Sequence, residues 1–259
     1  MSTEELLKEF GKYAKELDTK HDRYERIIKI SRDVTIESKR IIFLLHTIDP
    51  NKNNFEKVLN EAKDRLNKVC LTSFKSIAKE LSDLDQYQYL KAFAPGLQEF
   101  IESYTYYEYC SSASNPENGQ QMCSWEDLQK KLTYESEEGK KTYVLVEPLE
   151  FILGVGDLTG ELMRKCINSL GSGDVSSSFN IANSLKSFYT CYKGLNVHNR
   201  ELGRKIQTLR NSLLKTDNVS YNIKIRSEEA VKLGKTFDPR EVLEEINAPK
   251  DEHVDEGFF

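Results

Sequence analysis

Proline and glycine are scarce in this sequence of 259 residues, which contains 6 Pro and 13 Gly and has its first proline at Pro50. Because these residues interrupt regular secondary structure, their scarcity favours long helices over an architecture of short strands and turns. Charged residues make up 31% of the chain and hydrophobic residues 38%, a balance typical of amphipathic helices with solvated outer faces. A chain of this length buries roughly 70–75% of its unfolded surface, so its core needs neither a disulfide nor a metal.

The sequence also lacks the patterns of several other classes of protein. Its five cysteines are odd in number and show no CxxC or CxxH spacing, which predicts reduced thiols rather than a disulfide framework or a zinc site. No apolar run approaches the ~20 residues of a membrane span, and the charged N-terminus is not typical of a secretory signal. With a net charge of −5, any nucleic-acid partner requires a local basic patch or basic residues from a second subunit.

Several catalytic motifs are absent as well. The sequence contains no Gly-x-Ser-x-Gly elbow, no P-loop and no Gly-x-Gly-x-x-Gly loop. A di-iron site in a helical bundle needs two Glu-x-x-His motifs, and none of the four histidines lies three residues after a glutamate. The motifs for a nucleophilic serine, for a nucleotide loop and for a di-iron centre are therefore missing.

Helical periodicity predicts an all-α fold, a single bundle of about six to seven helices. Residues 134–142 are expected to form a charged loop, residues 1–234 one helical domain, and residues 235–259 an acidic, mobile tail. The expected helices lie at about residues 3–48, 54–81, 85–112, 125–132 and 148–171. A further helix is expected to begin after the cap residue Asp174, and a last one to span about residues 198–226.

The segment from Pro148 to Gly171 is apolar on nearly every side, which is typical of a helix buried at the centre of its protein. Asp157 and Glu161 are four residues apart on its narrow polar stripe and share one face. Two carboxylates in a partly buried site repel each other unless a cation neutralises them, and oxygen-rich sites suit Mg²⁺ or Mn²⁺. The alternative is that Arg164 or Lys165 pairs with these acids and that the stripe is an ion-paired interface.

A second pair of acids, Glu99 and Glu102, lies three residues apart on the polar side of the helix expected at 85–112. Such a pair is usually a solvated surface feature when it stands alone. If the two helices are neighbours, however, the four carboxylates converge on one or two divalent ions. A site of this kind activates water and stabilises the charge on a pentacoordinate phosphate.

Three segments of the sequence resemble the translin family, and they are closer to the branch of translin-associated factor X than to translin itself. These segments are HDRYERIIKISRDVTIESKRIIFLLH (21–46), GLQEFIE (96–102) and GVGDLTGELMRKCINSLGSGD (154–174). The similarity extends from about Phe10 to Arg226, which is most of the chain. The resemblance implies an all-α bundle of about seven helices, in agreement with the periodicity.

The resemblance also implies an activity. The chain is expected to assemble with translin into a hetero-oligomeric shell that acts as a Mg²⁺-dependent endoribonuclease on single-stranded RNA. In this family, such complexes activate the RNA-induced silencing complex by removing the nicked passenger strand, and they trim transfer-RNA precursor fragments. The family patterns G-L-Q-E-x-x-E and D-L-T-G-E place the acids that bind Mg²⁺ (or Mn²⁺) and act on water at Glu99, Glu102, Asp157 and Glu161.

The family's RNA-contacting region corresponds to the basic face of the first helix, at Lys39 and Arg40. Lys29 and Arg32 fall on the same face of the helical wheel and are added for that reason, with a merely solvated face as the alternative. The rival function is a non-catalytic scaffold that binds translin and recruits nucleic acid or other proteins. The expected location is the cytoplasm. The nucleus is placed second because the basic nuclear-targeting extension common in the family is not seen in this sequence.

Overall fold

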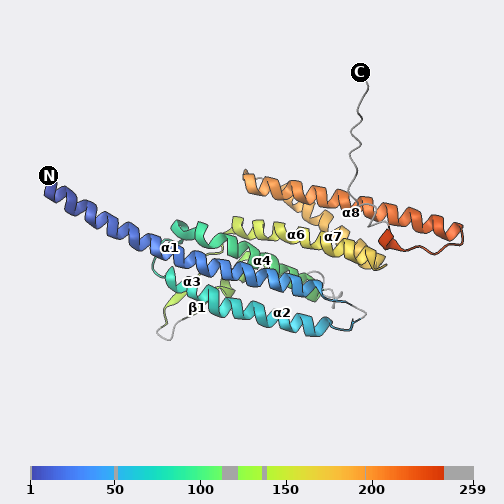
Figure 1. Ribbon diagram of the computed structural model, residues 1–259, viewed down its shortest axis with the longest axis horizontal. Coiled ribbons are helices and arrows are strands. Elements are labelled where there is room, and N and C mark those ends of the chain that lie inside the picture. Colours follow the sequence, from blue (N-terminus) through green and yellow to red (C-terminus); the bar gives the residue numbers. More distant parts are fainter. Residues whose placement is uncertain (1, 50–51, 113–121, 136–138, 196, 242–259) are drawn as a thin grey trace, which may run out of the picture. The chain divides into compact units, whose positions relative to one another are not determined.

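The computed structural model describes residues 2–49, 52–112, 122–135, 139–195 and 197–241, and in these ranges it contains eight α-helices and one small hairpin (Figure 1). The predicted all-α fold is confirmed. The chain divides into two compact units, Met1–Leu158 and Thr159–Phe259, which are described separately. Within the described ranges, no helix is both long and apolar enough to cross a membrane. The tail expected at 235–259 lies outside the description from residue 242 onward.

The first helix, α1 (Thr3–His46), begins with a reciprocal cap. The Ser2 hydroxyl accepts a hydrogen bond from the Glu5 backbone N–H at 3.2 Å, and the Glu5 carboxylate accepts one from the Ser2 N–H at 2.6 Å. At helical periodicity Ile27, Ile30, Val34, Ile41 and Leu45 fall on one side of α1, and this apolar face is largely buried. Its fully buried members are Ile27, Val34, Ile41 and Leu45, whereas Ile30 is only half-buried. This buried face directs α1 against the helices that follow.

The helix expected at residues 54–81 is present as one nearly continuous rod. Its parts are α2 (Phe55–Val69), a π-helical turn (Cys70–Phe74) and α3 (Lys75–Glu80). Arg65 of α2 pairs with Glu37 of α1 at 3.0 Å, and Glu80 pairs with Arg26 at 2.9 Å. Because later residues of the rod meet earlier residues of α1, the two run antiparallel, side by side in Figure 1.

The helix α4 (Leu90–Ser112), preceded by a 3₁₀ turn at Gln86–Tyr89, packs closely against α1. A Cβ atom at Gly96 would lie 2.6 Å from the backbone oxygen and from the hydroxyl oxygen of Ser31. The Gly96 N–H donates to that hydroxyl at 3.2 Å. Fifteen residues further along α1, His46 Nδ1 lies 3.1 Å from the hydroxyl of Tyr106. Contacts that advance along both helices together show that α1 and α4 are parallel.

The helix α5 (Trp125–Lys131) starts at Ser124, whose hydroxyl accepts a hydrogen bond from the Asp127 N–H at 3.2 Å. A hairpin follows where the sequence predicted only a charged loop, and it consists of β1 (Thr133–Glu135) and β2 (Lys141–Tyr143). The loop prediction was therefore wrong at both ends of the segment; residues 136–138 lie outside the description. The Tyr134 hydroxyl donates to the Cys70 carbonyl at 2.7 Å. This tertiary contact favours a strand at Tyr134, although the charged sequence of the segment favours a loop.

The helix α6 (Pro148–Gly171) crosses from the first unit into the second, where α7 (Val175–Gly194) and α8 (Arg200–Lys232) follow. Asp174 caps α7 as predicted, accepting a hydrogen bond from the Ser177 N–H at 3.0 Å. Lys186 of α7 pairs with Asp217 of α8 at 3.2 Å. The helix α8 ends at Lys232 rather than at the predicted residue 226, because no Gly or Pro interrupts it before Gly234, whose φ is +63°.

None of the five cysteines forms a disulfide, as their spacing predicted. Burial raises the pKa of the Cys70 and Cys166 thiols to about 11, so both stay protonated near neutral pH. A protonated, buried thiol is neither a good nucleophile nor a metal ligand. These two cysteines therefore behave as small core residues.

The cap of α8 provides a test of local stability in the second unit. The Asn199 side-chain oxygen accepts hydrogen bonds from the N–H groups of Glu201 and Leu202 at 2.9 and 3.0 Å. Asn199→Ala should lower the free energy of unfolding by about 1–2 kcal/mol, whereas Asn199→Asp should retain most of it. Urea denaturation followed by circular dichroism measures both; equal stability of Asn199→Ala and wild type would contradict the assigned cap.

Candidate active site

The backbones of α4 and α6 approach each other closely at Gly154. A Cβ atom at this glycine would lie 2.7 Å from Ile101 Cβ and 2.9 Å from the Gln98 carbonyl oxygen, both on α4. One turn earlier, the Gln98 amide donates to the Glu150 carboxylate at 2.6 Å. Residues 98 and 101 thus meet residues 150 and 154 in the same order, so α4 and α6 run parallel and are fixed in register.

The predicted acids lie around this approach. Glu99 and Glu102 each lie next to one of the two α4 residues that meet Gly154, and Asp157 follows Gly154 by less than one turn. Glu161 comes one turn later on the same helix. All four side chains belong to half-buried residues, neither enclosed in the core nor fully solvated. The neighbouring helices that the sequence argument required are therefore present.

Cations of the chain itself pair with two of these acids. Lys39 Nζ on α1 lies 3.1 Å from Glu99 Oε1, and Arg164 lies 3.5 Å from Glu161, its neighbour on α6. Among the residues that the structure describes, no three His, Cys, Asp or Glu side chains converge as a metal site. The alternative weighed for the α6 stripe, pairing with Arg164, is thus observed for Glu161.

The donor set nevertheless suits a hard divalent cation. All four candidate ligands are carboxylates, the oxygen donors that Mg²⁺ and Mn²⁺ prefer, and Glu99, Glu102 and Asp157 belong to the part of α4 and α6 whose backbones are in contact at Gly154. Glu99 and Glu161 would have to exchange an ammonium and a guanidinium for the metal. Both cations are more than half exposed, so each can rotate away from its acid into solvent.

The predicted RNA-contacting residues are all exposed on α1. Lys39 and Arg40 lie together on the wall of a hollow of about 620 Å³, whereas Lys29 and Arg32 do not line it. The hollow lies between α1 and α2, and its lining consists of Lys39, Arg40, Phe43, Leu44, Thr47 and Arg65. Lys39 therefore belongs both to this hollow and to the ion pair with Glu99.

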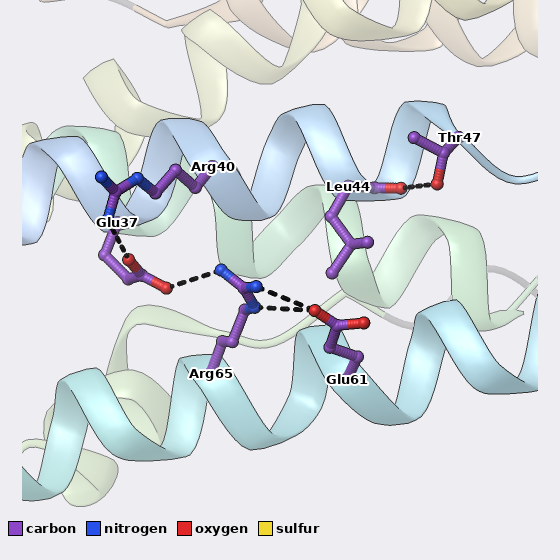
Figure 2. Close-up of polar contacts among 6 residues, drawn as sticks. All are labelled: Glu37, Arg40, Leu44, Thr47, Glu61 and Arg65. Carbon is purple, nitrogen blue, oxygen red and sulfur yellow. Dashed lines mark hydrogen bonds and ion pairs between the residues drawn. The ribbon is translucent and has the colours of Figure 1, made fainter.

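Sequence reasoning missed Arg65 and Phe43. Figure 2 shows Arg65 between two carboxylates, with hydrogen bonds of 3.0 Å to Glu37 on α1 and 2.8 Å to Glu61 on its own helix. The spacing of four residues between Glu61 and Arg65 is visible in the sequence. The contact with Glu37 joins residues 28 positions apart and depends on how α1 and α2 pack. Only the tertiary structure reveals it.

This all-α fold, with acids paired along two parallel helices, is that of the translin class, and the chain belongs to the translin family, whose model matches residues 22–227. The chain is 34% identical to translin-associated protein X of Rattus norvegicus, over 98% of this chain and 88% of the relative. The same protein of Mus musculus is 34% identical over 95% of this chain and 85% of the relative. The translin-associated protein X homolog of Schizosaccharomyces pombe is 24% identical over 85% of this chain and 89% of the relative.

Solved structures share the fold. Apo-NeC3PO superposes with a TM-score of 0.62 at 19% identity, over 83% of this chain and 96% of that chain. AfC3PO in its complex with duplex RNA superposes with a TM-score of 0.59 at 18% identity, over 84% of this chain and 97% of that chain. At these identities the likeness establishes the arrangement of the helices and no more.

Gly154→Ala tests the close approach of α4 and α6. The added methyl group has to displace the Gln98 backbone or the Ile101 side chain, so the free energy of unfolding should fall by about 1–3 kcal/mol. Gly11→Ala is the matched control, because nothing lies within 4 Å of its Cβ position in α1. Removing that helix glycine should leave stability unchanged or raise it by up to about 1 kcal/mol. Similar effects of the two substitutions in urea denaturation would argue against the contact.

Proposed function

We propose that this protein is the catalytic subunit of a Mg²⁺-dependent endoribonuclease, assembled with translin, that cleaves single-stranded RNA. The main observation behind the proposal is the close approach of α4 to α6 at Gly154. Glu99, Glu102 and Asp157 belong to the parts of these two helices that flank this approach. Support also comes from family membership and from 34% identity to relatives named translin-associated protein X. The C3PO structures, one of them with duplex RNA, share the fold.

Glu99 and Glu102 on α4, with Asp157 and Glu161 on α6, would hold the Mg²⁺, for which Mn²⁺ can substitute. When bound, the ion supplies positive charge beside the scissile phosphate and makes the attacking water more acidic. The contacts at Gly154 and Gln98 fix the register of α4 against the first part of α6, and with it the backbone positions of Glu99, Glu102 and Asp157. Half-burial also limits competing solvent around these side chains.

The basic face of α1 would bind the RNA backbone. Lys39 and Arg40 have side chains that are 63% and 66% exposed, so both can turn toward a phosphate. Lys39 is the link to the acids, since it leaves Glu99 when it binds a phosphate oxygen. Lys29 and Arg32, exposed on α1, would add weaker, nonspecific attraction.

Activation of the RNA-induced silencing complex by removal of the passenger strand, and trimming of transfer-RNA precursor fragments, are the cellular reactions we infer for the complex with translin. Both need cleavage of unpaired or nicked RNA in the cytoplasm, with the nucleus as a second location. The family to which the chain belongs supports this assignment.

Removal of one acid tests the chemistry. In the assembled complex, Glu102→Gln should reduce cleavage of labelled single-stranded RNA in Mg²⁺ by at least about a hundredfold, because a neutral amide binds and orients poorly where a carboxylate is needed. EDTA should abolish cleavage. Glu126→Gln on α5, at an exposed residue outside the site, is the matched control and should cleave normally. Unchanged cleavage in EDTA or by Glu102→Gln would refute the carboxylate–metal mechanism.

The ends of the products provide a second test. Acids that activate water make no use of the ribose 2′-hydroxyl, so the products should carry a 3′-hydroxyl and no cyclic phosphate. A substrate methylated at the 2′-hydroxyl should still be cut. Mass spectrometry of the fragments decides the question, and 2′,3′-cyclic phosphates would rule out this chemistry.

A second candidate is a non-catalytic scaffold that binds translin and recruits nucleic acid or other proteins. Two observations favour it: Lys39 pairs with Glu99, and the acids among the described residues do not converge as a three-ligand group. An intact complex that binds RNA but shows no cleavage in Mg²⁺ or Mn²⁺ would support the scaffold.

A further inference from the structure

The hollow between α1 and α2 has a composition that the proposed catalytic chemistry does not require. Three of its six lining residues are cations, Lys39, Arg40 and Arg65, and one is the aromatic residue Phe43. Its volume of about 620 Å³ falls within the range of about 300–1,000 Å³ typical of small-molecule sites. Phe43 lies three and four residues after Arg40 and Lys39, so all three project from the same side of α1.

Phe43 is unusually exposed for its type. Its relative exposure is 74%, compared with 63% for Phe10 and 66% for Phe179. The ring thus adds little to the core of the unit, and its apolar surface faces water beside two cations. An open aromatic face next to positive charge is the arrangement on which proteins stack unpaired bases.

The cations retain hydrogen-bonding capacity. Glu61 and Glu37, neither of which lines the hollow, hold Arg65 in place (Figure 2), and hydrogen bonding to Glu61 raises the pKa of its guanidinium. Arg40 makes one contact of 3.3 Å, to Glu37, and a guanidinium carries five N–H donors. A positioned arginine and two exposed cations can therefore surround a phosphate.

A second, smaller hollow shares one lining residue with the first. Its volume is about 250 Å³, and Arg40 lines both hollows. Lys68, Thr72 and Ser73 of the α2 rod contribute an ammonium group and two hydroxyl groups to its wall, beside the acidic Asp33 and Glu37. The Thr72 hydroxyl donates to the Lys68 carbonyl at 2.7 Å, so Lys68 and Ser73 offer the donor contacts to the sugar and phosphate that follow along a strand.

We propose that the hollow lined by Phe43 and Arg65 binds one unpaired nucleotide, with its base stacked on Phe43 and its phosphate bound by Lys39, Arg40 and Arg65. This inference rests on the proposed function and specifies its substrate. A base within a duplex is covered on both faces by its neighbours, so only unpaired RNA can use the ring. Because Lys39 also pairs with Glu99, a nucleotide that takes this lysine frees an acid of the candidate active site.

The test is a binding measurement on the complex with translin in EDTA, using fluorescein-labelled oligouridine and fluorescence anisotropy. Phe43→Ala should weaken binding by about fivefold to 150-fold, the loss expected for one stacked base. Phe43→Leu should lose nearly as much, because it keeps apolar bulk without a flat ring, whereas Phe43→Trp should bind as well as wild type or more tightly. A blunt RNA duplex should bind equally to all four proteins.

Two further variants separate stacking from charge. Phe10→Ala, at another exposed phenylalanine of the same helix (63%), should leave the affinity unchanged. Arg65→Gln should reduce the slope of log affinity against log salt by about one, whereas Phe43→Ala should leave that slope unchanged.

The outcomes are distinct. Unchanged oligouridine binding by Phe43→Ala, or an equal loss with the duplex, would overturn the nucleotide site. So would dissociation of the complex by Phe43→Ala, seen by size-exclusion chromatography, because the ring would then contact a protein partner. Loss of binding by Phe43→Ala in EDTA, with cleavage that survives Glu102→Gln, would uphold the nucleotide site while rejecting the proposed chemistry.

Discussion

The contact of α4 with two neighbouring helices is the constraint on which the rest of the first unit depends. At Gly96 the helix meets α1, and at Gly154 of α6 it meets a second backbone, and in both places a single methyl group would collide with main-chain atoms. Packing this tight allows little rotation or sliding of the three helices. The acids of α4 and the start of α6 therefore occupy fixed positions.

Charge pairing connects this packed core to the basic face. Glu99 and Lys39, predicted separately as a catalytic acid and an RNA contact, form one ion pair between α4 and α1. Such a pair at a half-exposed position is worth little to stability, on the order of 0.2–1 kcal/mol. A weak pair is easily exchanged, so the two residues can separate when stronger partners arrive.

Much of the fold could be predicted from the sequence because helices depend on local signals. The periodicity of residues 3–48 and the cap at Asp174 specified boundaries that the structure reproduces within a few residues. The hairpin at 133–143 was missed because a tertiary contact, from Tyr134 to Cys70, determines its backbone. The acids were identified from their spacing and from the family resemblance, whereas Phe43 and Arg65 join only when α1 and α2 pack.

The ion pairs of Glu99 and Glu161 also bear on whether folding needs a metal. Zinc-finger domains fold only when their metal binds, because the free energy of metal binding supplies the free energy of folding. Here a lysine and an arginine of the chain compensate two acids of the candidate site. The helical packing of the chain therefore does not depend on a divalent cation to neutralise these two acids, and an ion bound at the proposed site would have to displace the lysine and the arginine.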